Sequence, residues 1–393
     1  MKPVLAAAAA IALAGSMLAR PALAQTPIRP DTPSILFWHG EQQAAGFRTI
    51  ETIYKTHVIR RGTKVHPLPV AARQIDPTFQ YQGKTWTVAD YMKAYRVSGL
   101  LVIKDGKVVM ERYGLGRGPH DRWTSFSVAK SLTSTLVGAA IQDGKIKSLN
   151  SPVTDYIPEL KGSAYEGVTV RQMLMMSSGV KWNEDYADPK SDVAQAGQNT
   201  VPPGHDPMVD YLAKLPRALT PGSKFHYNTG ETDLVGILVS NAVGMPLADY
   251  ASQKIWKPYG MEQDAVWMTD TADRERGGCC ISMTLRDYGR VGEFILGGGR
   301  AGGKQVVPMD WVHEATRVQI DNGSPKPGGY GYFWWITSPE RFDAEGIFGQ
   351  SITVYPKDKL VIVQNAAWPT AVGDELYLAE DAMLAGVRKA AVK

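Results

Sequence analysis

The stretch TSFSVAKSLTSTLVGAAIQDGKI, residues 124–146, decides the fold and holds the first candidate site. Its pattern predicts a helix over 127–142 that is apolar nearly all round, and such a helix is buried. Ser127 and Lys130 stand three residues apart, so both side chains lie on one helix face. Burial disfavours the charged form of a lysine, which lets Lys130 accept the proton of the Ser127 hydroxyl. The backbone N–H of Ser127, at the helix N-terminus, can bind a developing oxyanion.

An S-x-x-K pattern is weak evidence by itself, because two fixed residues at this spacing often arise by chance. The alternative is a helix-capping serine followed by a surface lysine. The strongly apolar helix, and the hairpin predicted just before it, favour a buried pair.

Two further stretches predict β-hairpins, one on each side of a helical middle. Residues 99–113, GLLVIKDGKVVMERY, place two β-rich runs around Asp105-Gly106, which is typical of a type I′ turn. Residues 351–365, SITVYPKDKLVIVQN, repeat the pattern, and an amphipathic helix is predicted over 374–389. Helical patterns in the middle occur at 127–142, 169–176, 207–214, 230–243, 248–256 and 284–296.

These patterns predict an α/β (α+β) fold, an antiparallel sheet flanked by helices with an inserted helical domain. One domain, 96–393, would take its sheet part from about 96–145 and 330–393 and its helical part from about 146–329. Residues 25–95 have weak periodicity and are interpreted as an N-terminal wrapping segment. A site between the sheet and helical parts would follow the general preference of ligand sites for such junctions.

The N-terminal residues 1–24 have the features of a secretory signal peptide. Lys2 precedes an apolar run over 4–18, and Ala22-Leu23-Ala24 is a small-residue cleavage signal. The alternative, an uncleaved anchor, is disfavoured because the run is short and Arg20 interrupts it. We therefore expect a secreted, periplasmic protein with no membrane span after cleavage.

Composition excludes several classes of function. The chain has 393 residues, 44% hydrophobic and 21% charged, which is typical of a folded globular protein. Two cysteines do not make a disulfide scaffold or a Cys-rich zinc site, and the seven histidines show no ligand spacing. We therefore expect no metal and no organic cofactor. The formal charge of +4 comes without a basic block, so no nucleic-acid partner is expected.

Two more stretches contain candidate site residues. In PGSKFHYNTGETDLVGIL, residues 221–238, Tyr227 precedes a small-residue turn and a helix, where its phenol can relay a proton. The alternative is a buried tyrosine that anchors a loop. In EGIFGQSITVYP, residues 345–356, Gly346 permits close backbone approach to a ligand, and the N–H of Ile347 is a candidate second oxyanion donor. The alternative there is a plain bulge or turn.

Together these stretches resemble the serine β-lactamase and penicillin-binding superfamily. The resemblance is closest to the class C β-lactamase-like esterases and amidases, which include the 6-aminohexanoate-dimer hydrolases. It extends over nearly the whole chain after the leader and includes the DYADP loop at 185–189 and GGCCISMTLRDYGRVGEF at 277–294. It implies Ser127 as nucleophile, Lys130 as its general base and Tyr227 as general acid/base.

The same resemblance implies an oxyanion hole made by the N–H groups of Ser127 and Ile347. It also implies that Tyr186 closes over an amide substrate, the alternative being an ordinary exposed loop aromatic. The implied activity is cleavage of an ester or amide through an acyl-enzyme, with a small-molecule substrate as the partner and a homodimer as the candidate assembly.

Two departures from the superfamily pattern narrow the substrate. Thr229 stands where the second motif usually has an asparagine, and the K-T-G motif is replaced by Ala344-Glu345-Gly346. Glu345 would repel the carboxylate of a β-lactam if it faces the site. Esters or amides are therefore favoured, with a β-lactamase or D-Ala-D-Ala carboxypeptidase as the alternative enzyme. A degenerate binding protein that has lost turnover is the alternative of another class.

Other candidate substrate contacts are weaker. The resemblance places Cys279 and Cys280 near the cleft, where we interpret them as small buried residues, because a disulfide between neighbours is rare. Trp334 and Trp335 are more typical of core, although one of them, Trp334 in our assignment, is a candidate wall of the acyl pocket.

Overall fold

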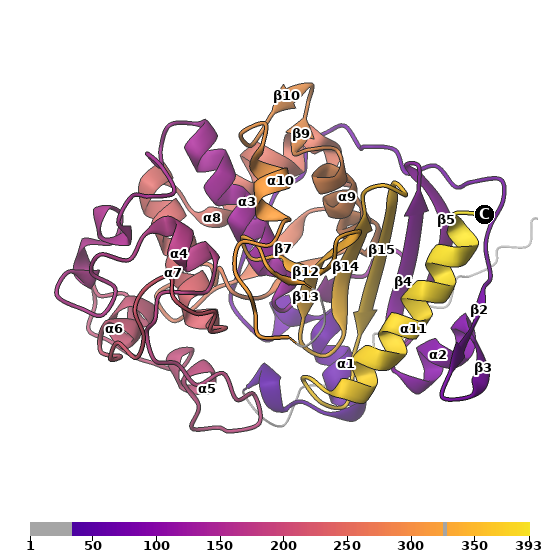
Figure 1. Ribbon diagram of the computed structural model, residues 1–393, viewed down its shortest axis with the longest axis horizontal. Coiled ribbons are helices and arrows are strands. Elements are labelled where there is room, and N and C mark those ends of the chain that lie inside the picture. Colours follow the sequence, from indigo (N-terminus) through magenta and orange to yellow (C-terminus); the bar gives the residue numbers. More distant parts are fainter. Residues whose placement is uncertain (1–33, 325–327) are drawn as a thin grey trace, which may run out of the picture.

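The computed structural model describes residues 34–324 and 328–393 (Figure 1). The predicted signal peptide, residues 1–24, lies outside the described residues. Among those described, the main sheet has seven strands in the order β11-β12-β13-β14-β15-β4-β5, and all its pairs are antiparallel. Its strands are β4 (Val97–Lys104), β5 (Lys107–Tyr113), β11 (Gly329–Tyr330), β12 (Trp335–Ser338), β13 (Arg341–Gly346), β14 (Gln350–Tyr355) and β15 (Leu360–Ala366).

Both predicted hairpins are confirmed, and they meet in this sheet. Asp105 and Gly106 join β4 to β5 with positive φ angles of 49° and 71°, which is the backbone that a type I′ turn requires. Strand β15 pairs with β4, so segments some 250 residues apart in sequence become neighbours at the centre of the sheet. The sheet therefore joins the early and late parts of the chain.

Both faces of the sheet are buried, because alternate residues of each strand point to opposite sides. Leu101 and Ile103 belong to one hydrophobic core, and Leu100 and Val102 belong to the other. Helices α2 (Val88–Ala94) and α11 (Asp374–Ala391) cover the second core, and α11 crosses that face in Figure 1. Helices α3 (Val128–Gln142) and α9 (Leu285–Leu296) cover the first.

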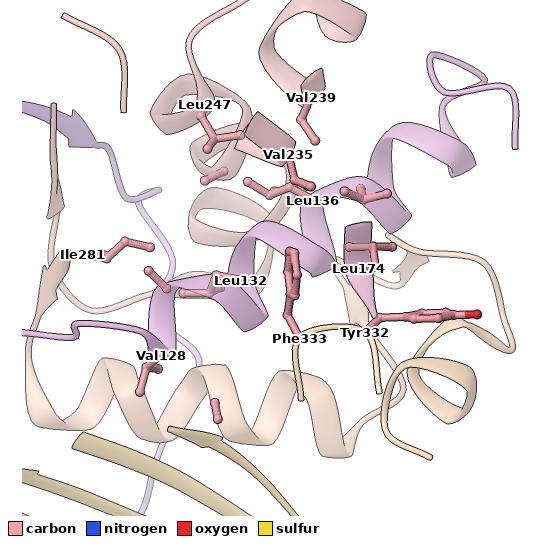
Figure 2. Close-up of a cluster of buried hydrophobic side chains, with 14 of the residues drawn as sticks. Val128, Leu132, Leu136, Leu174, Val235, Val239, Leu247, Ile281, Tyr332 and Phe333 are labelled. Atoms are coloured by element: carbon pink, nitrogen blue, oxygen red, sulfur yellow. The ribbon is translucent and has the colours of Figure 1, made fainter. Parts of the chain in front are cut away.

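The helical part forms a lobe beside the sheet, at the left of Figure 1. The predicted helices are confirmed there as α4 (Val170–Leu174), α6 (Pro207–Ala213), α7 (Thr229–Val243), and α8 (Leu247–Ala251) running into the π-helical segment η5 (Ser252–Gly260). The lobe also contains α5 (Asp192–Ala196), and α10 (Trp311–Ala315) lies nearer the sheet. Helix α3 packs against α7, and Figure 2 shows Leu132 and Leu136 of α3 among apolar side chains of this lobe.

Shorter elements connect these parts. A second sheet in the described chain has the order β1-β7-β8-β6, so β1 of the N-terminal segment pairs with β7 of the helical region. The remaining strands are β1 (Thr56–Ile59), β2 (Thr78–Tyr81), β3 (Lys84–Thr87), β6 (Trp123–Thr124), β7 (Ala265–Met268), β8 (Ile281–Met283), β9 (Arg300–Ala301) and β10 (Lys304–Gln305). The remaining helical segments are α1 (Gly40–Arg48), η1 (Ile35–Phe37), η2 (Ile50–Thr52), η3 (Val153–Asp155) and η4 (Pro158–Leu160).

Within residues 34–324 and 328–393, no single helix is long and apolar enough to cross a membrane. One bent pair, α7 with α8 and η5, passes a test of length and composition. Much of that pair belongs to the first hydrophobic core, which accounts for its apolar character.

Candidate active site

Ser127 immediately precedes α3, and its hydroxyl makes no capping bond to the helix. The hydroxyl instead lies 2.9 Å from Nζ of Lys130, one helical turn further on. Lys130 is 1% exposed. The interpretation as a capping serine with a surface lysine is therefore wrong, and the structure brings the two side chains together in a buried pair.

The environment of Lys130 favours its neutral form. Burial lowers the pKa of this lysine to about 8, against the opposing influence of Glu184 and Asp233, and Arg276 lowers it slightly further. Besides Ser127, Nζ lies 3.0 Å from Oγ1 of Thr229 and 2.8 Å from the carbonyl oxygen of Gly278. The ammonium still predominates at neutral pH, and the fraction of neutral amine is larger than for an ordinary lysine and grows as the pH rises.

The segment before β8 places the Gly278 carbonyl on Lys130. The Gly278 N–H donates to Oδ1 of Asp233 at 2.8 Å, and the other carboxylate oxygen pairs with Arg276 at 3.0 Å. A Cβ on Gly278 would lie 2.9 Å from Cγ2 of Thr229, so glycine allows this close approach. The sequence motif GGCC thus contributes a backbone acceptor that its residue types did not indicate.

The two cysteines that follow correct one expectation. We interpreted Cys279 and Cys280 as separate small residues, but the structure joins them in a disulfide between neighbours. Cys280 is fully buried, and Cys279 lines a small cavity beside Ser127.

Tyr227 lies directly before Asn228, the N-cap of α7, and faces the Ser–Lys pair. The Lys130 Nζ is 5.2 Å from the centroid of its ring, and the Trp335 indole stacks on the ring with 5.6 Å between centroids. Burial raises the pKa of Tyr227 well above its usual value, while a hydrogen bond with Ser127 opposes the rise. The phenol therefore keeps its proton near neutral pH and can donate it.

The two candidate oxyanion donors meet where β13 ends. A Cβ on Gly346 would lie 2.5 Å from the Ser125 carbonyl oxygen and 2.9 Å from the Ser127 nitrogen, so the end of β13 lies directly against the start of α3. Ile347 follows this glycine and lines the same cavity as Ser127. In the described chain, neither the Ser127 nor the Ile347 N–H donates to another protein group.

The turn into Ser127 is held in an uncommon backbone conformation. Phe126 has a φ of 43°, in the left-handed region that costs energy for a bulky residue. Its ring packs on Phe47 at 4.9 Å and on Phe348 at 5.2 Å between centroids. This aromatic cluster, which the sequence did not reveal as such, fixes the orientation of the residue that follows.

Two cavities bounded by described residues meet at Ser127. The larger is about 820 Å³ and the smaller about 170 Å³, and Ser127, Tyr186 and Ile347 line both. Gly346 lines the larger cavity, and Thr229 and Cys279 line the smaller. A substrate bound at Ser127 can therefore place the part on one side of its scissile bond in the larger cavity and the other part in the smaller cavity.

Trp334 is not part of this site. It is 1% exposed and packs edge-on against Phe342 in the core, with 5.3 Å between centroids. Its neighbour Trp335 lines the larger cavity instead. The assignment of Trp334 as a pocket wall was wrong, because successive residues entering a strand point to opposite faces.

Glu184 is a member of the site that the sequence did not single out. Its carboxylate accepts hydrogen bonds from the Thr229 hydroxyl and, at 3.0 Å, from the Thr229 N–H. It also accepts from Trp182 Nε1 and, at 2.8 Å, from the Tyr186 hydroxyl. Tyr186 is therefore a half-buried, anchored side chain and not an ordinary exposed aromatic. The signal that could have found Glu184 is its place two residues before Tyr186.

Glu345, which stands in place of the K-T-G motif, lines the larger cavity. Burial, with the nearby Asp343 and Glu380, raises the pKa of Glu345 to about 8. The one arginine on this wall among the described residues, Arg341, is already paired with Asp343 at 2.9 Å and Asp381 at 2.8 Å. Among the residues that the structure describes, this wall therefore presents no free cation to a substrate carboxylate.

A search of the described residues found no group of three or more His, Cys, Asp or Glu side chains that could hold a metal ion.

The antiparallel sheet, the helical lobe and the buried serine at the start of α3 are features of the serine β-lactamase fold. The Beta-lactamase family model matches residues 87–385, and the chain belongs to that family. It is 35% identical to 6-aminohexanoate-dimer hydrolase of Paenarthrobacter ureafaciens over 285 residues, 68% of this chain and 72% of that protein. A β-lactamase of Pseudomonas fluorescens is 25% identical over 221 residues, 53% of this chain and 55% of that protein.

Solved structures share the fold. One from Bacillus anthracis, whose name gives 6-aminohexanoate-dimer hydrolase as a provisional assignment, has a TM-score of 0.82 at 23% identity and covers 94% of this chain and 98% of its own. A penicillin-binding protein from Bacillus halodurans has a TM-score of 0.60 at 16% identity and covers 76% and 99%. The predicted family and fold are confirmed by these matches.

Proposed function

We propose that the protein is a serine hydrolase that cleaves an ester or amide through an acyl-enzyme on Ser127. The observation that carries the proposal is the 2.9 Å separation between Ser127 Oγ and Nζ of a lysine buried to 1% exposure. A nucleophilic serine needs a neighbouring base, and a lysine with a pKa lowered to about 8 is such a base.

The proposed reaction has two steps, acylation and deacylation of Ser127, and both require proton transfers. Lys130 takes the Ser127 proton as Oγ attacks the carbonyl carbon, and the N–H groups of Ser127 and Ile347 bind the oxyanion. Tyr227, which is protonated, donates its proton to the leaving alcohol or amine and recovers one from the Lys130 ammonium. Water then attacks the acyl-enzyme, Lys130 and Tyr227 again move protons, and Ser127 is released with the acid product.

Two observations favour an ester or amide over a β-lactam. Among the described residues, Glu345 and the paired Arg341 leave the wall of the larger cavity without a free positive charge for a carboxylate. The 35% identity to 6-aminohexanoate-dimer hydrolase favours amide bonds between short aliphatic units. A β-lactamase or D-Ala-D-Ala carboxypeptidase is the second candidate, and a binding protein without turnover is the third.

The test is hydrolysis of p-nitrophenyl butyrate, 6-aminohexanoate dimer and nitrocefin by the mature protein and by Ser127→Ala. A matched control is Ser223→Ala, which changes an exposed serine. We expect turnover of the ester or the dimer that is lost in Ser127→Ala alone, with a phosphonate adduct on Ser127 by intact mass. Equal rates in Ser127→Ala would refute the nucleophile, and preferred turnover of nitrocefin would support the second candidate. No turnover and no adduct would favour the binding protein.

We also propose that the protein is exported after removal of residues 1–24. The supporting pattern is the charged start, apolar run and small-residue signal before Gln25. Mass spectrometry of the protein from its native cell envelope should give an N-terminus at Gln25, and an intact Met1 on the envelope protein would contradict cleavage.

A further inference from the structure

The direction of the hydrogen bonds around Lys130 is set by the chemistry of its three oxygen neighbours. A neutral amine has two N–H bonds and one lone pair. The Gly278 carbonyl, 2.8 Å away, can only accept, so it takes one N–H. If Thr229 Oγ1, 3.0 Å away, takes the second, the lone pair is left for Ser127.

A threonine hydroxyl can donate or accept, so its direction must be fixed by another group. The Thr229 hydroxyl has Glu184 Oε1 on its other side. An ionised carboxylate can only accept, so the Thr229 proton is committed to Glu184 and its lone pairs face Lys130.

Glu184 is itself held firmly in this orientation. Its Oε2 accepts from two groups that can only donate, the Thr229 N–H and the Trp182 indole N–H. Its Oε1 accepts from the hydroxyls of Thr229 and Tyr186. The carboxylate thereby joins the loop that carries Tyr186 to the start of α7.

We propose that Glu184 is a positioning residue that fixes the direction of the Thr229 hydroxyl, so that neutral Lys130 turns its lone pair toward Ser127. The inference rests on the proposed function, because it concerns the base of that same reaction. It assigns Thr229 to orientation of the base and explains how a threonine serves at this position.

The charged and titratable groups around Lys130 make the test specific. Glu184 from its loop and Asp233 from α7 favour the ammonium, Arg276 before β8 opposes it, and the Tyr227 ring lies on the remaining side. Changing Glu184→Gln removes one negative charge, so the pKa of Lys130 falls. That shift follows from the charge of Glu184 alone, so the loss of kcat and its dependence on Thr229 are what test the positioning role.

Glutamine is a close match in shape to Glu184. Its carbonyl oxygen can still accept from Trp182 and Thr229, while its NH₂ donates to the hydroxyls on the other side. The Thr229 proton is then free to point at the Lys130 lone pair, which removes that lone pair from Ser127. The substitution should therefore slow acylation although it makes the amine easier to deprotonate.

The experiment measures kcat, KM and pH profiles on p-nitrophenyl butyrate for Glu184→Gln, Thr229→Val, Thr229→Ser and the double variant Glu184→Gln/Thr229→Val. We expect kcat of Glu184→Gln to fall about 10- to 100-fold, which is part of the roughly 10²- to 10⁴-fold that general-base catalysis usually contributes, with KM changed little. The acid limb should move to lower pH. Thr229→Val should lose a similar factor, and Thr229→Ser, which keeps the hydroxyl, should restore most of it.

Non-additivity identifies the route of the effect. If Glu184 acts through Thr229, the double variant should be little slower than Thr229→Val alone. The control is Glu159→Gln, an exposed residue outside the site, and melting temperatures report folding. Unchanged kcat and pH midpoint in Glu184→Gln, or fully additive losses, would overturn the proposal.

If Glu184→Gln fails to fold, the two threonine variants still test the proposal. Equal activity of Thr229→Val and the wild-type protein would overturn the positioning role. Ser127→Ala separates this failure from failure of the function. Activity that persists in Ser127→Ala refutes the proposed reaction. If Ser127→Ala is inactive but Glu184→Gln has wild-type activity, only the positioning role is refuted.

Discussion

The α-carbon of Gly346 lies so close to Ser127 that a Cβ on the glycine would be 2.9 Å from the Ser127 nitrogen. This contact joins the end of β13 to the start of α3, and so brings together the two backbone N–H groups that we assign to the oxyanion hole. The strand and the helix come from segments more than 200 residues apart in the sequence. Glycine is required because the same Cβ would also meet the Ser125 carbonyl oxygen at 2.5 Å.

Replacing this glycine should therefore damage catalysis. In Gly346→Ala the strand end must move away from Ser127, and kcat should fall by about 10²- to 10³-fold, the usual effect of losing one oxyanion donor. Gly118→Ala is the matched control, because a Cβ there meets only an ordinary 3.5 Å contact. Steady-state kinetics of the two variants measure the loss of kcat in each. A near-normal kcat in Gly346→Ala would argue against an oxyanion hole at this contact.

The pKa of Lys130 predicts the pH dependence of the reaction. Burial lowers that pKa to about 8, and the neutral amine is the active form. Because the neutral fraction grows as pH rises, kcat/KM should increase about tenfold per pH unit below the midpoint and level off above it. Rates measured on a neutral ester between about pH 6 and about pH 10 give the midpoint. A profile that is flat over this range, with Lys130→Met still active, would exclude Lys130 as the base.

The neighbouring tryptophans should have separate effects. Trp335→Ala removes the indole stacked on Tyr227, so kcat/KM should fall about two- to tenfold, as expected from the strength of aromatic pairs. Trp334→Ala instead opens a cavity in the core and should lower the free energy of unfolding by about 3–5 kcal/mol. Urea unfolding and steady-state kinetics of both variants test this prediction. A large loss of stability in Trp335→Ala together with a loss of activity alone in Trp334→Ala would contradict it.

Glu345 should make selection against carboxylate substrates depend on pH. Its pKa is raised to about 8, so the side chain is largely neutral below that pH and negative above it. The ratio of kcat/KM for p-nitrophenyl butyrate over that for mono-p-nitrophenyl glutarate should therefore rise as pH increases through this range. Lys130 affects both esters equally and cancels in the ratio.

The variant Glu345→Gln provides the control for this selection. It should show a weaker pH dependence, although Glu380, whose pKa burial raises to about 7, lines the same cavity and still contributes. A ratio with the same pH dependence in wild type and Glu345→Gln would mean that Glu345 does not sense the substrate charge.

Local patterns were enough to predict the hairpins and the main helices. Asp105-Gly106 specifies its own turn, and the apolar residues of α3 require burial wherever the helix packs. The Ser127–Lys130 contact was also predictable, because three residues of helix place both side chains on one face. The Trp334 assignment failed because the sequence indicates the strand register only to within one position. A shift of one position changes which of two neighbouring residues faces the cavity and which faces the core.

The sequence by itself determined the family and the fold class, and it placed Ser127 and Lys130 on one helix face, since each motif involved consists of residues close together in the chain. Only the tertiary structure decided that Glu184 accepts from Thr229, that the Gly278 carbonyl lies on Lys130, and that Gly346 lies against Ser127. Each of these contacts joins residues 45 or more positions apart. Their distance and direction depend on how the sheet, α3 and α7 pack, and no local pattern of side chains records that packing.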